Sequence, residues 1–270
     1  MITIILLLVL TGLLAGVIAG LMGLGGGILF VPVLLMFFQS AGIENPVLWT
    51  VGTSLICNFV AALSSSYKHY QMDNIFLKES LLVGVFGVAG TYVGRLIVTS
   101  PHYQEQEFTI FFSLILLYSA YHFFRRKKSD IKRARMVKPM VWYHGLMIGF
   151  AAGLLAPLAG VGGGLILIPA MSVVLSYSFK KLVSISSFSI VLITLSGSLQ
   201  FALISHEMSS YSGFHLGFID FGVALPLIVS SIFGARYGVK LLANVRLRTL
   251  ELIFGTLLIF VILRLIYGLF

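Results

Sequence analysis

The sequence predicts an all-α, polytopic integral membrane protein built from two inverted repeats of about five helical segments each. Hydrophobic residues make up 59% of the 270 positions and charged residues only 10%, a composition that suits lipid rather than water as the solvent. Apolar segments recur along both halves of the chain. In each half, a cluster of glycines interrupts the apolar sequence at a corresponding place, which indicates a repeated unit.

Charged residues and Gly/Pro-rich stretches divide the chain into ten apolar segments. The first half contains Ile2–Met22, Ile28–Phe38, Val47–Leu63, Leu81–Val98 and Phe108–Phe124. The second half contains Val141–Ala156, Leu165–Leu175, Leu182–Ile204, Phe214–Phe233 and Leu250–Phe270. The second segment of each half has about 11 residues, whereas a straight helix needs roughly 20 to cross a bilayer. Each of these two segments therefore predicts a half-helix, or one arm of a re-entrant pair.

A glycine-rich break precedes each short segment. Residues 16–32 read GVIAGLMGLGGGILFVP, and residues 153–169 read GLLAPLAGVGGGLILIP. Because lipid cannot hydrogen-bond freed backbone groups, such a break must be buried in protein or line a watery cavity. Two breaks, one per half, indicate the binding site of a transporter. Close helix packing is the alternative, although packing motifs separate their glycines by three residues and rarely place three in a row.

The basic residues predict the orientation. Eight Lys/Arg and one Asp lie between Arg125 and Lys138, so this stretch carries +7 of the formal charge of +9. Five elements per half place every loop Lys and Arg on one face, whereas fusing each broken pair into one span weakens the asymmetry. Because cytoplasmic loops collect Lys and Arg, we expect both termini outside and a cytoplasmic linker at 125–140. The linker joins a first repeat, 1–124, to a second repeat, 141–270, which is inverted because five elements is an odd number.

Several classes of function are excluded by what the sequence contains. The basic charge belongs to one loop, which argues against a nucleic-acid partner. A single cysteine, Cys57, allows no internal disulfide and no multi-cysteine metal site. The sequence has no phosphate-binding Gly-Lys-Thr loop and no cluster of His and Glu typical of a metalloenzyme. We therefore expect no enzymatic activity, no cofactor and no metal.

Further motifs accompany the two Gly-rich repeats, which end at Pro32 and Pro169. They are residues 51–54 (VGTS), His69 sixteen positions after Thr53, residues 217–221 (GFIDF), residues 90–95 (GTYVGR) and residues 234–236 (GAR). In these motifs the chain resembles the sulfite exporter TauE/SafE family of bacterial membrane transporters, also called the toluenesulfonate uptake permease family. It departs from the family where Asp73 replaces a usual Gly, Phe76 replaces a usual Asp, and SSFS at 186–189 replaces a second Gly-Thr-Ser.

The resemblance implies a function and a location. It implies transport of small sulfur-containing anions, such as sulfite or organosulfonates, across the bacterial cytoplasmic (inner) membrane. It does not choose among these anions. Import or export, the coupling ion and the oligomeric state, a homo-oligomer included, stay open at this point.

An anion inside the membrane needs hydrogen-bond donors and positive potential, but a buried positive side chain is costly there. A helix N-terminus offers both through unpaired N–H groups and the positive end of its dipole. Three glycines precede each half-helix, and their missing side chains let the backbone approach a ligand closely. The predicted first part of the site is therefore Gly25, Gly26 and Gly27 with Gly162, Gly163 and Gly164.

Polar side chains on the third segment of each half form the predicted second part of the site. They are Thr53, Ser54 and Asn58 in the first half and Ser186 and Ser187 in the second. Such a cluster in an apolar span suggests a wet path. The alternative is that these groups only hydrogen-bond neighbouring helices or their own backbone.

Four charged or titratable residues complete the prediction. Arg95 and Arg236 follow glycines at matching places of the two halves, where they could attract anions at each mouth or reach out to lipid head groups. His69 and Asp220 are candidates for proton coupling. The alternatives are that His69 is an interfacial residue and that Asp220 caps a helix start.

The sequence thus predicts a carrier with one site between two inverted halves, exposed alternately to each face of the membrane. Two other functions compete with this one. A passive anion channel would conduct without alternating exposure, and an accessory membrane scaffold of a sulfur-metabolism pathway would show no substrate-dependent flux.

Overall fold

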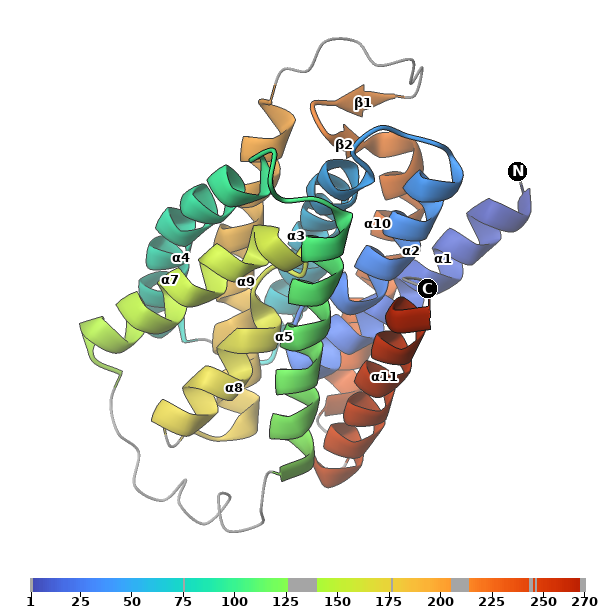
Figure 1. Ribbon diagram of the computed structural model, residues 1–270. Coiled ribbons are helices and arrows are strands. Elements are labelled where there is room, and N and C mark those ends of the chain that lie inside the picture. Colours follow the sequence, from blue (N-terminus) through green and yellow to red (C-terminus); the bar gives the residue numbers. More distant parts are fainter. Residues whose placement is uncertain are drawn as a thin grey trace.

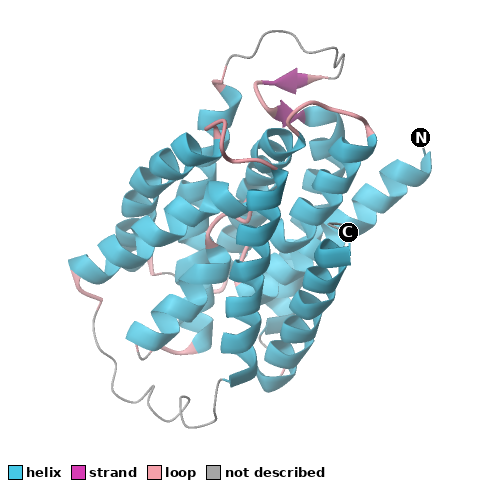
Figure 2. Cartoon of the chain, viewed as in Figure 1, coloured by secondary structure: helices cyan, strands magenta, loops and turns pink. Residues whose placement is uncertain are grey.

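The computed structural model shows a bundle of helices with a small two-stranded hairpin at one end (Figures 1 and 2). The structure describes residues 2–74, 76–125, 140–175, 177–204, 214–242, 245 and 247–267. Ten helices and two strands lie in this part of the chain. The predicted basic linker at 125–140 falls almost wholly outside the described residues.

Five helices come from each half of the chain. The first five are α1 (Ile2–Met22), α2 (Gly27–Ser40), α3 (Pro46–Gln71), α4 (Leu77–Val98) and α5 (Glu105–Arg125). The others are α7 (Trp142–Ala159), α8 (Gly164–Val174), α9 (Phe179–Ala202), α10 (Phe221–Leu242) and α11 (Leu247–Tyr267). Seven of the described helices are long and apolar enough to cross a membrane, whereas α2 and α8 have only 14 and 11 residues. The prediction of an all-α multi-pass membrane protein is confirmed.

Most predicted segments are shorter than the observed helices, and one prediction is wrong at its start. Charged residues marked the ends of the predicted segments, yet α3 continues through Lys68 to Gln71 and α4 begins before Lys78. Long Lys side chains reach the membrane surface while their helix continues, so a charge does not end a helix. Residues 214–220, predicted as helical, instead contain the strands β1 (His215–Leu216) and β2 (Ile219–Asp220), which pair antiparallel.

Helices of the two halves exchange partners. The first helix of each half packs along the fourth helix of the other half, so α1 lies on α10 and α7 lies on α4. Glycines allow this close approach, since a methyl group at Gly16 or Gly153 would overlap the backbone of Ser231 or Gly87. Small residues spaced by three intervening positions are typical of helix interfaces in membranes.

The two third helices, α3 and α9, pack on each other at the centre of the bundle. They are the most buried of the candidate membrane spans, whereas α1 and α4 are the least buried. The fifth helices, α5 and α11, lie side by side and run in opposite directions (Figure 1). The elements of the centre are therefore α3, α9 and the breaks that precede α2 and α8. The inverted relation of the two repeats stays a prediction, with which this exchange of partners agrees.

Candidate functional site

The two glycine-rich breaks meet inside the bundle. A methyl group at Gly27 would come within 2.6 Å of the Cα atom of Val161, in the break of the other half. A methyl group at Gly164 would overlap the carbonyl group of Leu24. Only glycine lets these two segments of the backbone approach this closely, so the glycines at both breaks allow their contact.

The backbone of the breaks is largely repeated. Two pairs of glycines that lie 137 positions apart share left-handed φ angles: Gly23 and Gly160 with 61° and 66°, and Gly25 and Gly162 with 74° and 72°. The next pair differs, because Gly163 has φ of 79° whereas Gly26 has φ of −91°. The breaks are thus close copies that diverge at the residue before each short helix.

A serine of each central helix crosses to the break of the opposite half. The hydroxyl of Ser54 on α3 donates a hydrogen bond to the carbonyl oxygen of Gly160 at 2.7 Å. The hydroxyl of Ser186 on α9 donates to the carbonyl oxygen of Gly23 at 2.5 Å. Gly23 and Gly160 hold equivalent places in the two breaks, so the two bonds form a matched pair. Each bond satisfies a backbone acceptor that the broken helix leaves free.

Asn58 lies between the two breaks and is fully buried. Its Nδ2 donates to the carbonyl oxygen of Gly160 at 3.2 Å, and its Oδ1 faces Gly25 without a donor among the described residues. A side-chain amide carries two N–H donors and one oxygen acceptor. The amide of Asn58 therefore keeps hydrogen-bonding capacity at the point where the breaks meet.

The short helices begin at the breaks. The first internal hydrogen bonds of α2 run from Leu29 and Phe30 to the carbonyl of Gly26, and those of α8 from Ile166 and Leu167 to that of Gly163. The last glycine of each cluster is thus the first helical residue, one position earlier than predicted. N–H groups ahead of these bonds have no partner within the helix, and both helix dipoles present their positive ends here.

Two of the predicted hydroxyl groups lie away from the breaks. The Oγ1 of Thr53 accepts a hydrogen bond from the backbone N–H of Asp220 at 3.1 Å, next to the hairpin. The Oγ of Ser187 lies 3.2 Å from the Oγ of Ser65 on α3. Along α3, Thr53 and Ser65 stand on either side of Asn58. The structure therefore brings Ser54, Asn58 and Ser186 to the meeting breaks. Thr53 lies on the side of the breaks that faces the hairpin, and Ser187 lies on the other side, next to Ser65.

Asp220 has the geometry of a helix cap. Its Oδ1 accepts hydrogen bonds from the backbone N–H groups of Gly222 at 2.7 Å and Val223 at 3.3 Å, in the first turn of α10. Such bonds satisfy N–H groups that a helix start leaves free. The carboxylate is buried at the end of the bundle that carries the hairpin, which agrees with the alternative of a helix cap for Asp220.

His69 holds the turn between α3 and α4. It is 2% exposed, and its Nδ1 lies 3.3 Å from the Nδ2 of Asn74. Its backbone carbonyl accepts hydrogen bonds from the N–H groups of Met72 and Asn74. The side chain is thus covered by protein at the end of α3, and lies near neither break.

The two arginines differ in their surroundings. Arg95 is half-buried near the end of α4, and its Nε has no acceptor among the described residues. Arg236 is exposed on α10. The two helices end at opposite ends of the bundle, α4 at the top and α10 at the bottom of Figure 1. Neither arginine joins the meeting breaks.

Some residues at this centre were not predicted. The carbonyls of Gly23 and Gly160 accept the crossing bonds, and the 137-residue repeat in the sequence could have identified them. The hairpin could not have been found from hydropathy. It packs Phe218 edge-on against Trp49 of α3, with 5.6 Å between ring centroids, and so covers one end of the central helix pair.

Comparisons with known proteins agree with this architecture. The sequence profile of the family described as sulfite exporter TauE/SafE matches residues 8–265. A probable membrane transporter protein of Methanocaldococcus jannaschii is 28% identical, over 93% of the chain and 91% of the relative. The probable membrane transporter protein YunE of Bacillus subtilis and one from Haemophilus influenzae are each 27% identical, over 97% of both chains. No solved structure matches significantly. The chain therefore belongs to the TauE/SafE family of membrane transporters.

Proposed function

We propose that this protein carries small sulfur-containing anions, such as sulfite or organosulfonates, through one central site by alternating access. The observation that carries the proposal is the meeting of the two breaks, tied together by the bonds from Ser54 to Gly160 and from Ser186 to Gly23. The family description, sulfite exporter, supports the class of substrate. The cytoplasmic membrane is the location that we propose.

The chemistry of the breaks suits an oxyanion. Two helix N-termini supply N–H donors and positive dipole ends, and the amide of Asn58 supplies a further polar group. Among the described residues, no Lys or Arg side chain lies at this point. Because the positive potential comes from partial charges, an anion should bind with moderate strength and leave easily, as a carrier requires.

A carrier fits the packing better than an open pore does. The side chains of Thr53, Ser54, Asn58, Ser186 and Ser187 are each at most 1% exposed. Toward one end, Phe218 of the hairpin loop packs against Trp49 and covers that end of α3. Toward the other, the Ser65–Ser187 pair joins α3 to α9. A site closed on both sides corresponds to an occluded state, from which each side opens in turn.

Flux through the purified protein in liposomes tests the proposal. We expect uptake of labelled sulfite or of a short organosulfonate, and loss of that uptake in Asn58→Asp, because a carboxylate at the meeting breaks repels the anion. Asn45→Asp is the matched control, since Asn45 is exposed in the loop before α3. Size-exclusion profiles of all three proteins check that they fold.

Two results would refute the proposal. One is wild-type protein that moves none of these anions, which favours the accessory scaffold. The other is folded Asn58→Asp protein with undiminished flux, which would show that the transported anion does not pass the meeting breaks.

A further inference from the structure

The short helix α8 contains a proline about one turn after it leaves the meeting breaks. Pro169 has no N–H group, so it cannot donate the usual helical hydrogen bond to the carbonyl of Leu165, four residues earlier. Leu165 is buried, and a buried carbonyl without a donor costs free energy. The first turn of α8 therefore depends on a donor from another element.

Ser119 on α5 is that donor. Its hydroxyl donates to the carbonyl oxygen of Leu165 at 2.9 Å, and its side chain is fully buried. Serine and threonine within helices often bond their own backbone instead, as Thr109 of α5 does with the carbonyl of Glu105 at 2.8 Å. The bond from Ser119 thus joins two helices at the point where the proline leaves a carbonyl free.

Two further bonds join this part of the chain to the second break and its helix. The phenol of Tyr103, in the loop before α5, donates to the carbonyl oxygen of Leu158 at 2.6 Å, just before the break. The Nε2 of His122 on α5 lies 2.8 Å from the Oγ of Ser172, near the end of α8. The segment from Tyr103 to His122 therefore holds the break and α8 at both ends, with the bond from Ser119 between them.

The first half has no hydroxyl at the equivalent place. Its short helix α2 also carries a proline, Pro32, four residues after Ile28, and packs against α11. Buried positions of α11 repeat the spacing of those on α5: they are Leu250, Phe254, Leu258 and Val261, against Phe108, Phe112, Leu116 and Ser119. Val261 thus stands where α5 has Ser119, and a valine side chain has no group to donate. The bond to Leu165 is therefore not a packing feature that both repeats share.

We propose that Ser119 is a positioning residue for the transported anion. Through the carbonyl of Leu165 it holds the first turn of α8, so that the N–H groups ahead of the first helical bonds stay directed at the meeting breaks. The inference rests on the proposed function, because the anion at the breaks is the ligand of these groups. A first turn that tilts or frays would misalign its donors and weaken their bonds to the anion.

Liposome flux of sulfite, measured in a double-mutant cycle, tests this role. We expect Ser119→Ala to raise the KM about 10-fold, the loss that follows when one hydrogen bond to a charged group is weakened, with a smaller change in the maximal rate. Pro169→Ala gives residue 169 an N–H group that can bond the carbonyl of Leu165 within α8. In that background, Ser119→Ala should change the KM by less than about twofold, because the carbonyl keeps a donor.

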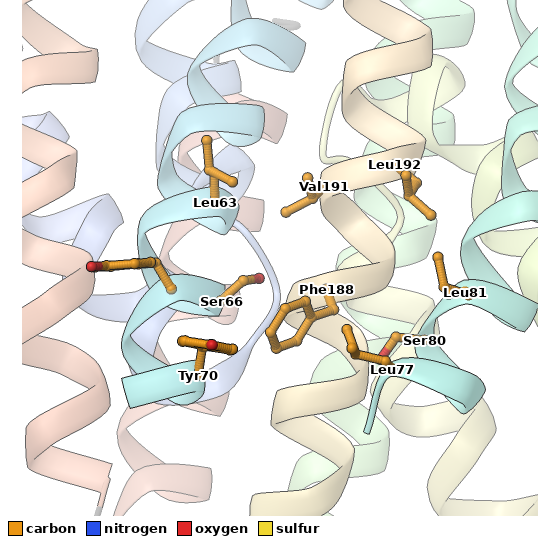
Figure 3. Close-up of a pocket in the computed structure, with 10 residues that line it drawn as sticks. Leu63, Ser66, Tyr70, Leu77, Ser80, Leu81, Phe188, Val191 and Leu192 are labelled. Carbon is orange, nitrogen blue, oxygen red and sulfur yellow. The ribbon is translucent and has the colours of Figure 1, made fainter. Parts of the chain in front are cut away.

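Ser66→Ala is the matched control. Ser66 is a buried serine of α3 whose hydroxyl has no hydrogen-bond partner among the described residues. It lines a groove of about 440 Å³ between α3, α4 and α9, which are not the helices that Ser119 joins (Figure 3). Loss of this hydroxyl should leave the KM unchanged.

Hydrogen–deuterium exchange in nanodiscs measures the hold on α8 without any transport. We expect Ser119→Ala to speed exchange of the amide groups of Ile166 and Leu167 in α8, and to leave those of Leu29 and Phe30 in α2 unchanged. Unchanged exchange in α8 would overturn the inference, and so would an equal effect of Ser119→Ala on the KM with and without the proline. Wild-type protein that moves no sulfite would instead refute the proposed function, and faster exchange in α8 would then show Ser119 to be structural only.

Discussion

Gly163 adopts a backbone conformation that is costly for any residue with a side chain. Its φ is 79°, and an added methyl group would lie 2.6 Å from the carbonyl oxygen of Ala152. We predict that Gly163→Ala loses about 1–2 kcal/mol of stability from backbone strain alone, and loses flux. Thermal unfolding in detergent and liposome flux would measure the two effects.

The equivalent change in the first half, Gly26→Ala, serves as the comparison. Gly26 has an ordinary φ of −91°, and its added methyl group would meet side-chain atoms, those of Phe30 and Ala15, rather than a backbone carbonyl. It should therefore destabilise the protein less than Gly163→Ala. A larger loss in Gly26→Ala would contradict the conformational account of the breaks.

We expect the two crossing serines to contribute unequally to stability, although their bonds match. The carbonyl of Gly160 also accepts a bond from Asn58, whereas Ser186 is the donor to Gly23. Ser186→Ala leaves a buried acceptor unpaired, at a cost of about 1–3 kcal/mol. We predict a larger drop in the melting temperature for Ser186→Ala than for Ser54→Ala. The exposed Ser40→Ala controls for loss of a hydroxyl, and equal drops in both crossing variants would refute the asymmetry.

At the scale of elements, the hairpin and the start of α10 depend on Asp220. We predict that Asp220→Asn keeps flux and its pH profile, because an amide oxygen still accepts from Gly222 and Val223. Asp220→Ala should lose about 1 kcal/mol of stability, the usual cost of a missing cap. If Asp220→Asn abolished the pH dependence of flux while the protein stayed folded, Asp220 would couple protons rather than cap the helix.

The elements also show how far hydropathy can predict this fold. The short helices α2 and α8 follow from segment length, since 11 apolar residues cannot span a bilayer. Hydropathy does not predict the strands at 215–220, because residues such as Phe218 and Ile219 are as apolar as those of a membrane helix. Their role depends on a contact with Trp49, which is more than 160 positions away in the sequence and carries no local signal.

The same limit applies to the site. The repeated glycines predict where the breaks lie, but the partners of the hydroxyl groups depend on how α3 and α9 pack. Thr53 and Ser54 are adjacent, yet one faces Asp220 and the other Gly160. On a helix, successive residues point about 100° apart, so neighbours in the sequence contact different elements.

At the scale of the molecule, the basic loops predict one orientation. The first turn of α1 lies in the upper part of Figure 1, and α5, which precedes the linker in the sequence, ends at the bottom. We predict an outside N-terminus and a cytoplasmic linker at 125–140, because Lys and Arg collect on the cytoplasmic side. Reporter fusions at the N-terminus and within the linker would decide the orientation. A cytoplasmic N-terminus would contradict the arrangement of five elements per half and the inverted repeat.

The central claim is that one site between the two breaks opens to each face in turn. Thr53 and Ser187 lie on opposite sides of the breaks, so each should be reachable from one face only. The test introduces Thr53→Cys or Ser187→Cys in a Cys57→Ala background and measures labelling in liposomes under an outward and then an inward substrate gradient. The account predicts that reactivity at the two positions changes in opposite senses when the gradient reverses. Simultaneous high reactivity at both positions, whatever the gradient, would show an open pore and contradict alternating access.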